Sequence, residues 1–274
     1  METINPLQNP KLANELAEKA MAEPDAKVQE VETLKAAALP SGEVELLAGH
    51  YNPFTGDLYM SAQVRELNGA DEEAISKLSN IGSVLLTILS RAVVSIGGEK
   101  ATSEMLEELL SGDRDLLLLH IRKITFGSTV PVYGSCTYCG SEDQEIVVDL
   151  DNDVKIVKLN DPVSDREFVI DCKVGPVEVV FPTGKLQKKM IQNSNKTAAE
   201  LDTMLLRDCI QSINGVPVMN DSQILNLGLM DRRKILSELI EKNPGPELSD
   251  IRKPCGACSK EVIISLSLAD LFRS

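Results

Sequence analysis

Two stretches decide the fold of this chain: Cys136-Thr137-Tyr138-Cys139 and Cys255-Gly256-Ala257-Cys258. A spacing of two residues lets both thiolates of a tight turn point at one metal ion, and two such turns complete a tetrahedron. Each pair also precedes a similar apolar stretch, Glu145–Leu150 after the first and Glu261–Leu266 after the second. This layout is typical of a zinc ribbon. It predicts one structural zinc ion whose ligands are Cys136, Cys139, Cys255 and Cys258.

The separation of the two pairs is unusual for a ribbon. Cys139 and Cys255 are separated by 115 residues, whereas the pairs of a ribbon are commonly about 15 to 20 residues apart. Because loop-closure entropy grows only with the logarithm of length, the longer loop costs about 2 kcal/mol extra. Structural zinc contributes on the order of 10 kcal/mol or more in small peptides. The intervening chain must therefore fold and return the second pair to the first.

Other roles fit the cysteines less well. A redox CxxC motif needs a helix directly after it to lower the thiol pKa, whereas both pairs here precede predicted strands. Iron in a rubredoxin-like site uses similar turns, so iron stays open as the less favoured metal. Four cysteines also close the coordination position that a catalytic zinc keeps for water. Cys172 and Cys209 occupy apolar strand and helix positions and are predicted to be core residues.

Composition excludes several classes of protein. The 274 residues include 42 Asp and Glu against 28 Lys and Arg, a formal charge of -14 that repels a phosphate backbone. Direct nucleic-acid binding is therefore not expected. The first twenty residues lack the basic and apolar regions of a secretory signal, which predicts folding in reducing cytoplasm. The most apolar stretch, residues 81–96, is too short to span a membrane and contains Arg91, so we expect a buried helix there and no membrane contact.

Apolar spacing along the chain predicts helices with a few hairpins between them. The expected helices cover residues 71–89, 103–110, 113–124, 197–210 and 231–242. Thr197 and Glu200 form a capping-box pair at the start of one helix, and period-two alternation predicts a hairpin over residues 168–181. No solenoid-type repeat is visible. We expect an α+β fold: a mostly helical body with short antiparallel β hairpins and a zinc-ribbon-like site.

The same patterns divide the chain into three segments: an N-terminal helical arm (1–40), a mainly helical domain (41–130), and a zinc-ribbon-containing α+β domain (131–274). The arm repeats apolar residues at helical spacing but has too little bulk to fold alone. We expect it to dock on a partner, with packing on its own domain as the alternative.

No motif for catalysis is visible. The sequence lacks a P-loop, a GxGxxG motif and an HExxH motif. Its two histidines, His50 and His120, have no Ser or Cys arrangement that would form a nucleophile and base. The expectation is therefore that the protein is not an enzyme.

Several segments resemble the T-even-like baseplate protein family of contractile-tailed bacteriophages. The resemblance is densest in residues 113–127, in the first cysteine pair, and in the strand that ends with Val148-Asp149-Leu150. The closing run from Cys255 to Phe272 is similar to the end of the family, and Leu39-Pro40-Ser41 with Arg65–Glu73 is similar to its beginning.

The resemblance implies a non-enzymatic structural component of the baseplate, in or near the hub. Such a protein is made in the host cytoplasm, resides in the virion tail baseplate, and contacts other baseplate and tail proteins in multiple copies of a symmetric assembly. One alternative is a tail or baseplate assembly chaperone that is absent from the mature virion. Another is a zinc-ribbon regulatory protein, against which the acidic balance and the lack of a basic helix argue.

Overall fold

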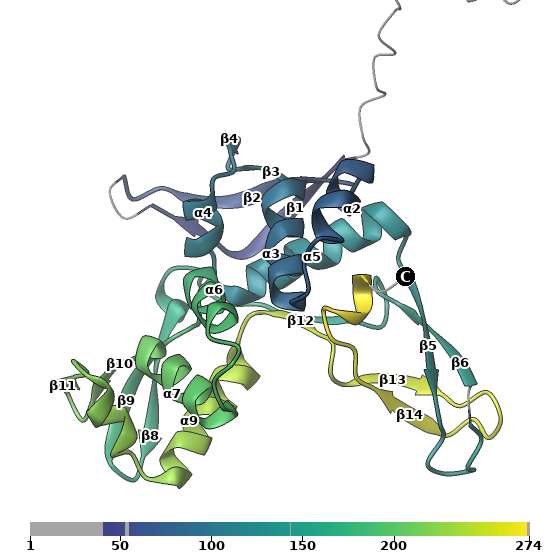
Figure 1. Ribbon diagram of the computed structural model, residues 1–274. Coiled ribbons are helices and arrows are strands. Elements are labelled where there is room, and N and C mark those ends of the chain that lie inside the picture. Colours follow the sequence, from purple (N-terminus) through teal and green to yellow (C-terminus); the bar gives the residue numbers. More distant parts are fainter. Residues whose placement is uncertain (1–40, 53–54, 143, 273–274) are drawn as a thin grey trace, which may run out of the picture. The chain divides into compact units, whose positions relative to one another are not determined.

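The computed structural model describes residues 41–52, 55–142 and 144–272 (Figure 1). The predicted helical arm, residues 1–40, lies outside the described residues. Of the described residues, 38% are helical and 31% lie in strands, and the strands form five antiparallel sheets. The prediction of a mostly helical body was therefore wrong, and the fold is a mixed α+β fold. Two apolar stretches that were expected to be helical contribute to the difference, because each begins as a helix and continues as a strand.

The first part of the chain builds a four-stranded antiparallel sheet of strand order β1-β2-β3-β4 with helices inserted after β2 and after β4 (Figure 1). A two-stranded hairpin, β5–β6, follows the last of these helices. The elements are β1 (Ser41–Tyr51), β2 (Leu58–Arg65), α2 (Gly69–Ile75), α3 (Ile81–Ala92), β3 (Val93–Ile96), β4 (Glu99–Lys100), α4 (Ser103–Glu108), α5 (Ser111–Phe126), β5 (Thr129–Gly134) and β6 (Gln144–Asp149).

The second part repeats this order of elements. Its sheet has the strand order β8-β9-β10-β11, again with two helices after the second strand and two after the fourth, and a hairpin at the end. The elements are β8 (Glu167–Cys172), β9 (Gly175–Val180), α6 (Gly184–Gln192), α7 (Ala198–Cys209), β10 (Ile210–Ile213), β11 (Val216–Pro217), α8 (Asp221–Leu225), α9 (Leu229–Lys242), β13 (Ile251–Pro254) and β14 (Glu261–Ile264). We call residues 41–149 the first repeat and residues 167–264 the second repeat.

Shorter elements lie outside this duplicated order. Strand β7 (Lys155–Val157), which follows the first repeat, pairs with β12 (Gly245–Glu247), which lies between α9 and β13. Two 3-10 turns cover Ser164–Arg166 and Asp270–Phe272. None of the helices in the described part of the chain combines the length and apolar character required to cross a lipid bilayer.

The duplication extends to individual hydrogen bonds. Asp113 on α5 accepts backbone N–H bonds from the end of β1, at Leu47, Ala48 and Gly49. Asp231, at the same place on α9, accepts N–H bonds from the β8–β9 turn, at Lys173 and Val174. The next residue in each helix, Arg114 or Arg232, donates to the carbonyl oxygen eight residues before it, that of Leu106 or Ile224. A buried carboxylate therefore holds the first hairpin of each repeat against its long helix.

The helix expected over residues 81–96 ends at Ala92 and becomes strand β3 without a break. Val93 and Ile96 are buried whereas Val94 is 44% exposed. The pairing of β3 with β2 shifts register between Val93 and Ser95, so the strand is irregular at Val94. The β-branched pair at residues 93 and 94 favours this extended backbone. Helix α7 changes into β10 in the same way after Cys209. The capping box of Thr197 and Glu200 at the start of α7 is confirmed, as is the β8–β9 hairpin.

Helix α5 and its N-cap contribute buried residues to all three hydrophobic clusters of the described residues. Leu117 and Ile121 are buried in a cluster with the first sheet, Leu119 belongs to the cluster beneath the two cysteine hairpins, and Leu110, the N-cap residue, belongs to the cluster of the second repeat. A helix that buries leucines on several sides has its neighbours all round it. This explains why Leu116 to Leu119 form an unbroken apolar run.

The start of α5 is also where the two repeats meet. Gly112 lies against the backbone of Pro244 and Gly245, which follow α9. Ser111 donates its N–H to the carbonyl oxygen of Pro182, and Gly184 donates to that of Leu109. Only a residue without a side chain at position 112 permits this close approach.

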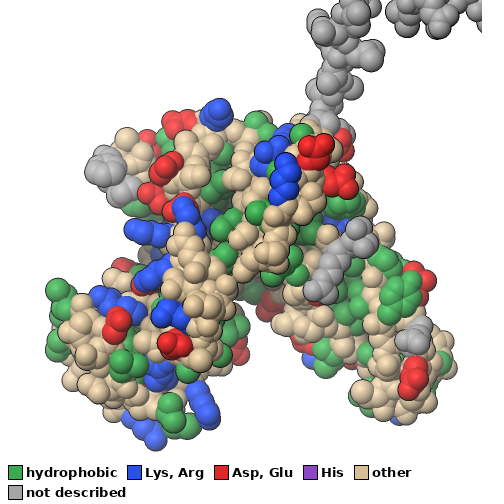
Figure 2. Space-filling model, in the orientation of Figure 1, with side chains coloured by type: hydrophobic (Ala, Val, Ile, Leu, Met, Phe, Trp, Pro, Cys, Tyr) green, Lys and Arg blue, Asp and Glu red, His purple; other side chains and the backbone are tan. Residues whose placement is uncertain are grey.

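Opposite charges reinforce the same contact. Figure 2 shows Lys and Arg side chains gathered over the second repeat on the visible face. Helix α6 carries Lys185, Lys188 and Lys189 with no acidic residue. Lys188 forms an ion pair with Glu107 of the first repeat, while Lys189 pairs with Asp208 on α7. Part of this basic helix is therefore neutralised by neighbouring acids.

Candidate metal centre

The two cysteine turns connect the strands of the two terminal hairpins and have the same backbone hydrogen bonds. Cys136 and Cys139 lie between β5 and β6, and Cys255 and Cys258 lie between β13 and β14. In each turn the N–H of the first cysteine donates to the carbonyl oxygen of the residue five positions later. The carbonyl oxygen of the same cysteine accepts from the N–H of the residue four positions later. The bonds are Cys136 to Ser141 at 2.9 Å, Gly140 to Cys136 at 2.9 Å, Cys255 to Lys260 at 2.8 Å and Ser259 to Cys255 at 2.8 Å.

A left-handed residue closes each turn directly after its second cysteine. Gly140 has φ +70° and Ser259 has φ +58°. Glycine adopts this conformation without strain, whereas serine is uncommon there. Because the second turn reproduces the same conformation with a side chain present, the turn geometry is determined by the bonds around the cysteines and not by glycine alone.

The four sulfur atoms converge, and all lie within 4.8 Å of one another. The Sγ atoms of Cys136 and Cys258 are 3.8 Å apart, and so are those of Cys139 and Cys255. A disulfide has its sulfurs about 2 Å apart, so these pairs are free thiols. Four sulfurs at about 2.3 Å from one ion in a tetrahedron are separated from one another by about 3.8 Å. The observed cluster therefore fits a tetrahedral metal ion.

The electrostatics of the cluster also fit a cation. Backbone N–H groups of Cys258 and Ala257 lower the pKa of the Cys255 thiol to about 6, against the opposing effect of desolvation. The N–H of Lys260 favours the thiolate of Cys258, but desolvation and the sulfur of Cys139 raise the pKa of Cys258 to about 11. Four adjacent sulfurs cannot all carry negative charge unless a positive ion lies among them.

A small hydrophobic core supports the sulfur cluster from below. Val130 and Val148 of the first hairpin are buried in the same cluster as Ile251 and Ile264 of the second. The two hairpins lie side by side in Figure 1, and β6 contacts β13. Cys136 and Cys255 are buried while Cys139 is exposed, which places the cluster at the edge of this core. The strands expected after each cysteine pair are confirmed.

The other candidate residues lie away from this cluster. Cys209 is buried in the core of the second repeat, as predicted, whereas Cys172 is partly buried and packs against that core. Burial raises the pKa of Cys209 to about 12. His50 lies 2.8 Å from Glu108 through Nε2 and stacks on Tyr59. Burial lowers the pKa of His120. Neither histidine contacts a cysteine sulfur among the bonds of the described residues.

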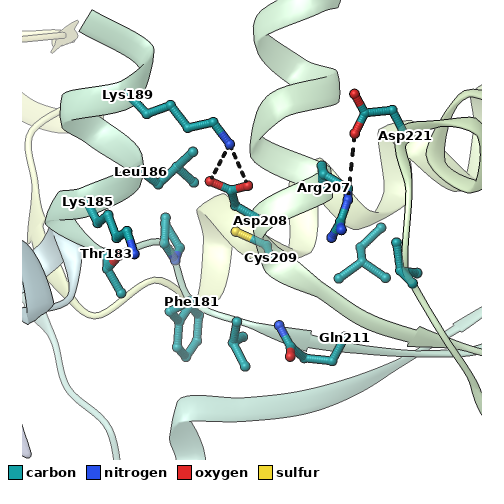
Figure 3. A pocket seen from close by; sticks show the side chains of 14 residues that line it. Phe181, Thr183, Lys185, Leu186, Lys189, Arg207, Asp208, Cys209, Gln211 and Asp221 are labelled. Carbon is teal, nitrogen blue, oxygen red and sulfur yellow. Dashed lines mark hydrogen bonds and ion pairs between the residues drawn. The ribbon is translucent and has the colours of Figure 1, made fainter. Parts of the chain in front are cut away.

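A cavity of about 740 Å³ lies in the second repeat between α6, α7 and the sheet. Figure 3 shows that two of its cationic side chains point toward carboxylates: Lys189 contacts both oxygens of Asp208 at 2.8 and 3.0 Å, and Arg207 lies 3.6 Å from Asp221. The thiol of Cys209 on its wall stays protonated because of its raised pKa. Cys209 is therefore not an activated nucleophile in this cavity.

Together, these observations describe a duplicated α+β fold with a cluster of four cysteine sulfurs between the hairpins that end its two repeats. The chain belongs to the T4 bacteriophage base plate protein family, whose model matches residues 33–273. The resemblance drawn from the sequence is thus confirmed. No curated protein and no solved structure matches the chain. Family membership makes the chain a component of the phage tail baseplate that contacts other baseplate or tail proteins.

Proposed function

We propose that this protein is a non-enzymatic structural component of the hub, or of the part next to the hub, of a contractile-tail baseplate. The observation that carries the proposal is the family match over residues 33–273, which includes both repeats and both cysteine pairs. Several copies would occupy equivalent positions in the symmetric particle. The protein would be synthesised in the host cytoplasm and retained in the mature virion.

We further propose that Cys136, Cys139, Cys255 and Cys258 hold one zinc ion as thiolates. This is supported by the sulfur separations of 3.8 Å and by the closed set of four sulfurs. The ion would connect the hairpin that ends the first repeat to the hairpin that ends the second. A role in catalysis is not part of the proposal, because four thiolates leave no coordination position for water.

Metal analysis of the purified protein under reducing conditions tests the metal assignment. We expect about one zinc per chain and a colourless protein, whereas bound iron would give visible absorption. Cys136→Ser and Cys258→Ser should release the metal and lower the free energy of unfolding. The matched control is Cys172→Ala, which should keep the metal and cost only packing energy. Equal metal loss in all three variants would show that the ligand assignment is wrong.

Mass spectrometry of purified particles tests the structural role. We expect the protein in mature virions at a fixed ratio to other baseplate proteins. Its presence in assembly intermediates together with its absence from virions would contradict retention and favour an assembly chaperone. The two experiments are independent, because a chaperone could also bind zinc.

A further inference from the structure

The side chain of Gln144 reaches the sulfur cluster from the first hairpin. Gln144 is the first residue of β6. Its side chain lies on the same face of this strand as Ile146 and Val148, which pack in the core beneath the hairpins. Its Oε1 atom lies 3.3 Å from the Sγ atom of Cys255, 111 residues away along the chain. The amide therefore connects the first hairpin to a cysteine of the second.

The nitrogen of this amide lacks a hydrogen-bond acceptor. The Nε2 atom of Gln144 is buried and has no hydrogen-bond partner among the described residues. A buried amide N–H without an acceptor costs free energy, so such an atom calls for an explanation. Whether the neighbouring Cys255 sulfur is a thiol or a thiolate decides whether it can accept a hydrogen bond from this nitrogen.

A thiol and a metal-bound thiolate make opposite demands on the amide. A thiol can donate its S–H to Oε1, but a thiolate has no proton and can only accept. An amide oxygen facing the Cys255 thiolate would place two acceptors against each other. A half-turn of the amide exchanges Oε1 and Nε2 without changing the shape of the side chain. The N–H would then point at the sulfur.

We propose that, in the metal-bound protein, Nε2 of Gln144 donates a hydrogen bond to the Cys255 thiolate and thereby sets the affinity of the site for its metal. This inference rests on the proposed zinc site. The bond withdraws charge from one of four thiolates and fixes Cys255 relative to the first hairpin. Residues that hold metal ligands in this way typically change metal affinity by about 10- to 100-fold when they are replaced.

The second repeat has no equivalent amide. Aligning Glu145 with Glu261 places Lys260 at the position of Gln144, and the ammonium group of Lys260 lies 4.9 Å from the centre of the Tyr138 ring. The two halves of the cluster are thus alike in their turns but different in their surroundings. Gln144 is a positioning residue for one side of the site only.

The test measures metal affinity in the full-length protein by competition with a chelating dye, with zinc as the metal. Gln144→Met keeps the length of the side chain but removes the donor, and we expect affinity about 10- to 100-fold lower. Gln144→Glu places a carboxylate against the thiolate and should weaken binding further. The matched control is Glu145→Gln, on the opposite face of the same strand, which should retain wild-type affinity. Circular dichroism of each metal-loaded variant checks that it is folded.

Cobalt(II) substitution supplies a second readout that packing alone would not change. Loss of a hydrogen bond to a thiolate raises the energy of its electrons, so the sulfur-to-cobalt charge-transfer band of Gln144→Met should move to longer wavelength. Wild-type affinity and an unmoved band in a folded Gln144→Met variant would overturn this inference while leaving the zinc site intact. A wild-type protein that binds neither zinc nor cobalt would instead overturn the proposed metal site.

Discussion

Gly112→Ala tests the close contact that joins the two repeats. A Cβ atom at this position would lie 1.3 Å from the carbonyl oxygen of Pro244 and 2.4 Å from its carbon. Both are backbone atoms, so no rotation of a side chain relieves the overlap. The Pro244 carbonyl would have to retreat by roughly 2 Å to restore an ordinary van der Waals contact.

The expected loss of stability follows from two opposing effects. Overpacking a well-packed site costs about 1 to 3 kcal/mol, and a backbone displacement of this size belongs at the upper end. Alanine inside a helix gains about 1 kcal/mol over glycine. The net loss in the free energy of unfolding should therefore be about 2 kcal/mol, and the pairing of β12 with β7 should weaken because Pro244 adjoins β12.

Urea unfolding followed by circular dichroism measures this effect. The matched control is Gly69→Ala, at the start of α2, where a Cβ would meet no atom within 4 Å. That variant should be as stable as wild type or gain up to about 1 kcal/mol. If Gly112→Ala unfolds at the same urea concentration as wild type, the reasoning that this contact requires glycine is refuted.

Burial raises the pKa of Asp115 to about 6, against its bond to Gln187. Because the folded chain binds this proton more tightly than the unfolded chain, stability is lost as pH rises from about 4 to about 6, by at most about 3 kcal/mol. Asp115→Asn should therefore stabilise the protein at pH 8 but not at pH 4 in urea titrations, and equal effects at both would contradict this. Asp113→Ala deprives three backbone N–H groups of their acceptor and Asp231→Ala two, at about 1 to 3 kcal/mol each. Asp113→Ala should unfold at a lower urea concentration than Asp231→Ala. The reverse order would contradict equivalent roles for the two carboxylates. Metal removal by a chelator should speed hydrogen exchange in β13 and β14 more than in α7, because their cores are separate clusters; uniform acceleration would argue against that separation.

Short-range signals in the sequence were sufficient to predict several turns, strands and helix ends. The spacing within each cysteine pair predicted its turn, and the alternation of apolar residues predicted the strands that follow. The capping box of Thr197 and Glu200 is likewise a local signal, because both bonds form within one helical turn. The side-chain types alone carry this information.

The helix-to-strand changes were missed because no breaker residue marks them. Ala92 and Val93 are both buried, and neither glycine nor proline separates them. Only the pairing of β3 with β2 shows where the helix stops. Propensity in such a stretch is overridden by tertiary contacts.

The duplication was missed because most matched positions carry different side chains. Ser111 and Gly112 are buried at the start of α5, whereas Leu229 and Met230 at the start of α9 are 71% and 62% exposed. The surviving signals are few: the Asp-Arg pair in each long helix, and the similar strands after the cysteines. The contact of Gln144 with Cys255 depends on the return of the chain over 111 residues, so no local pattern could predict it.

The two halves of the sulfur cluster leave the ribosome at different times. At a synthesis rate of about 5 to 20 residues per second, Cys255 follows Cys139 by roughly ten seconds. During that interval the first hairpin has only two of the four sulfurs and lacks Ile251 and Ile264, which complete the core beneath it. The cluster can close only after Cys258 has been made, so a translation product that stops after the first repeat lacks two of the four sulfurs.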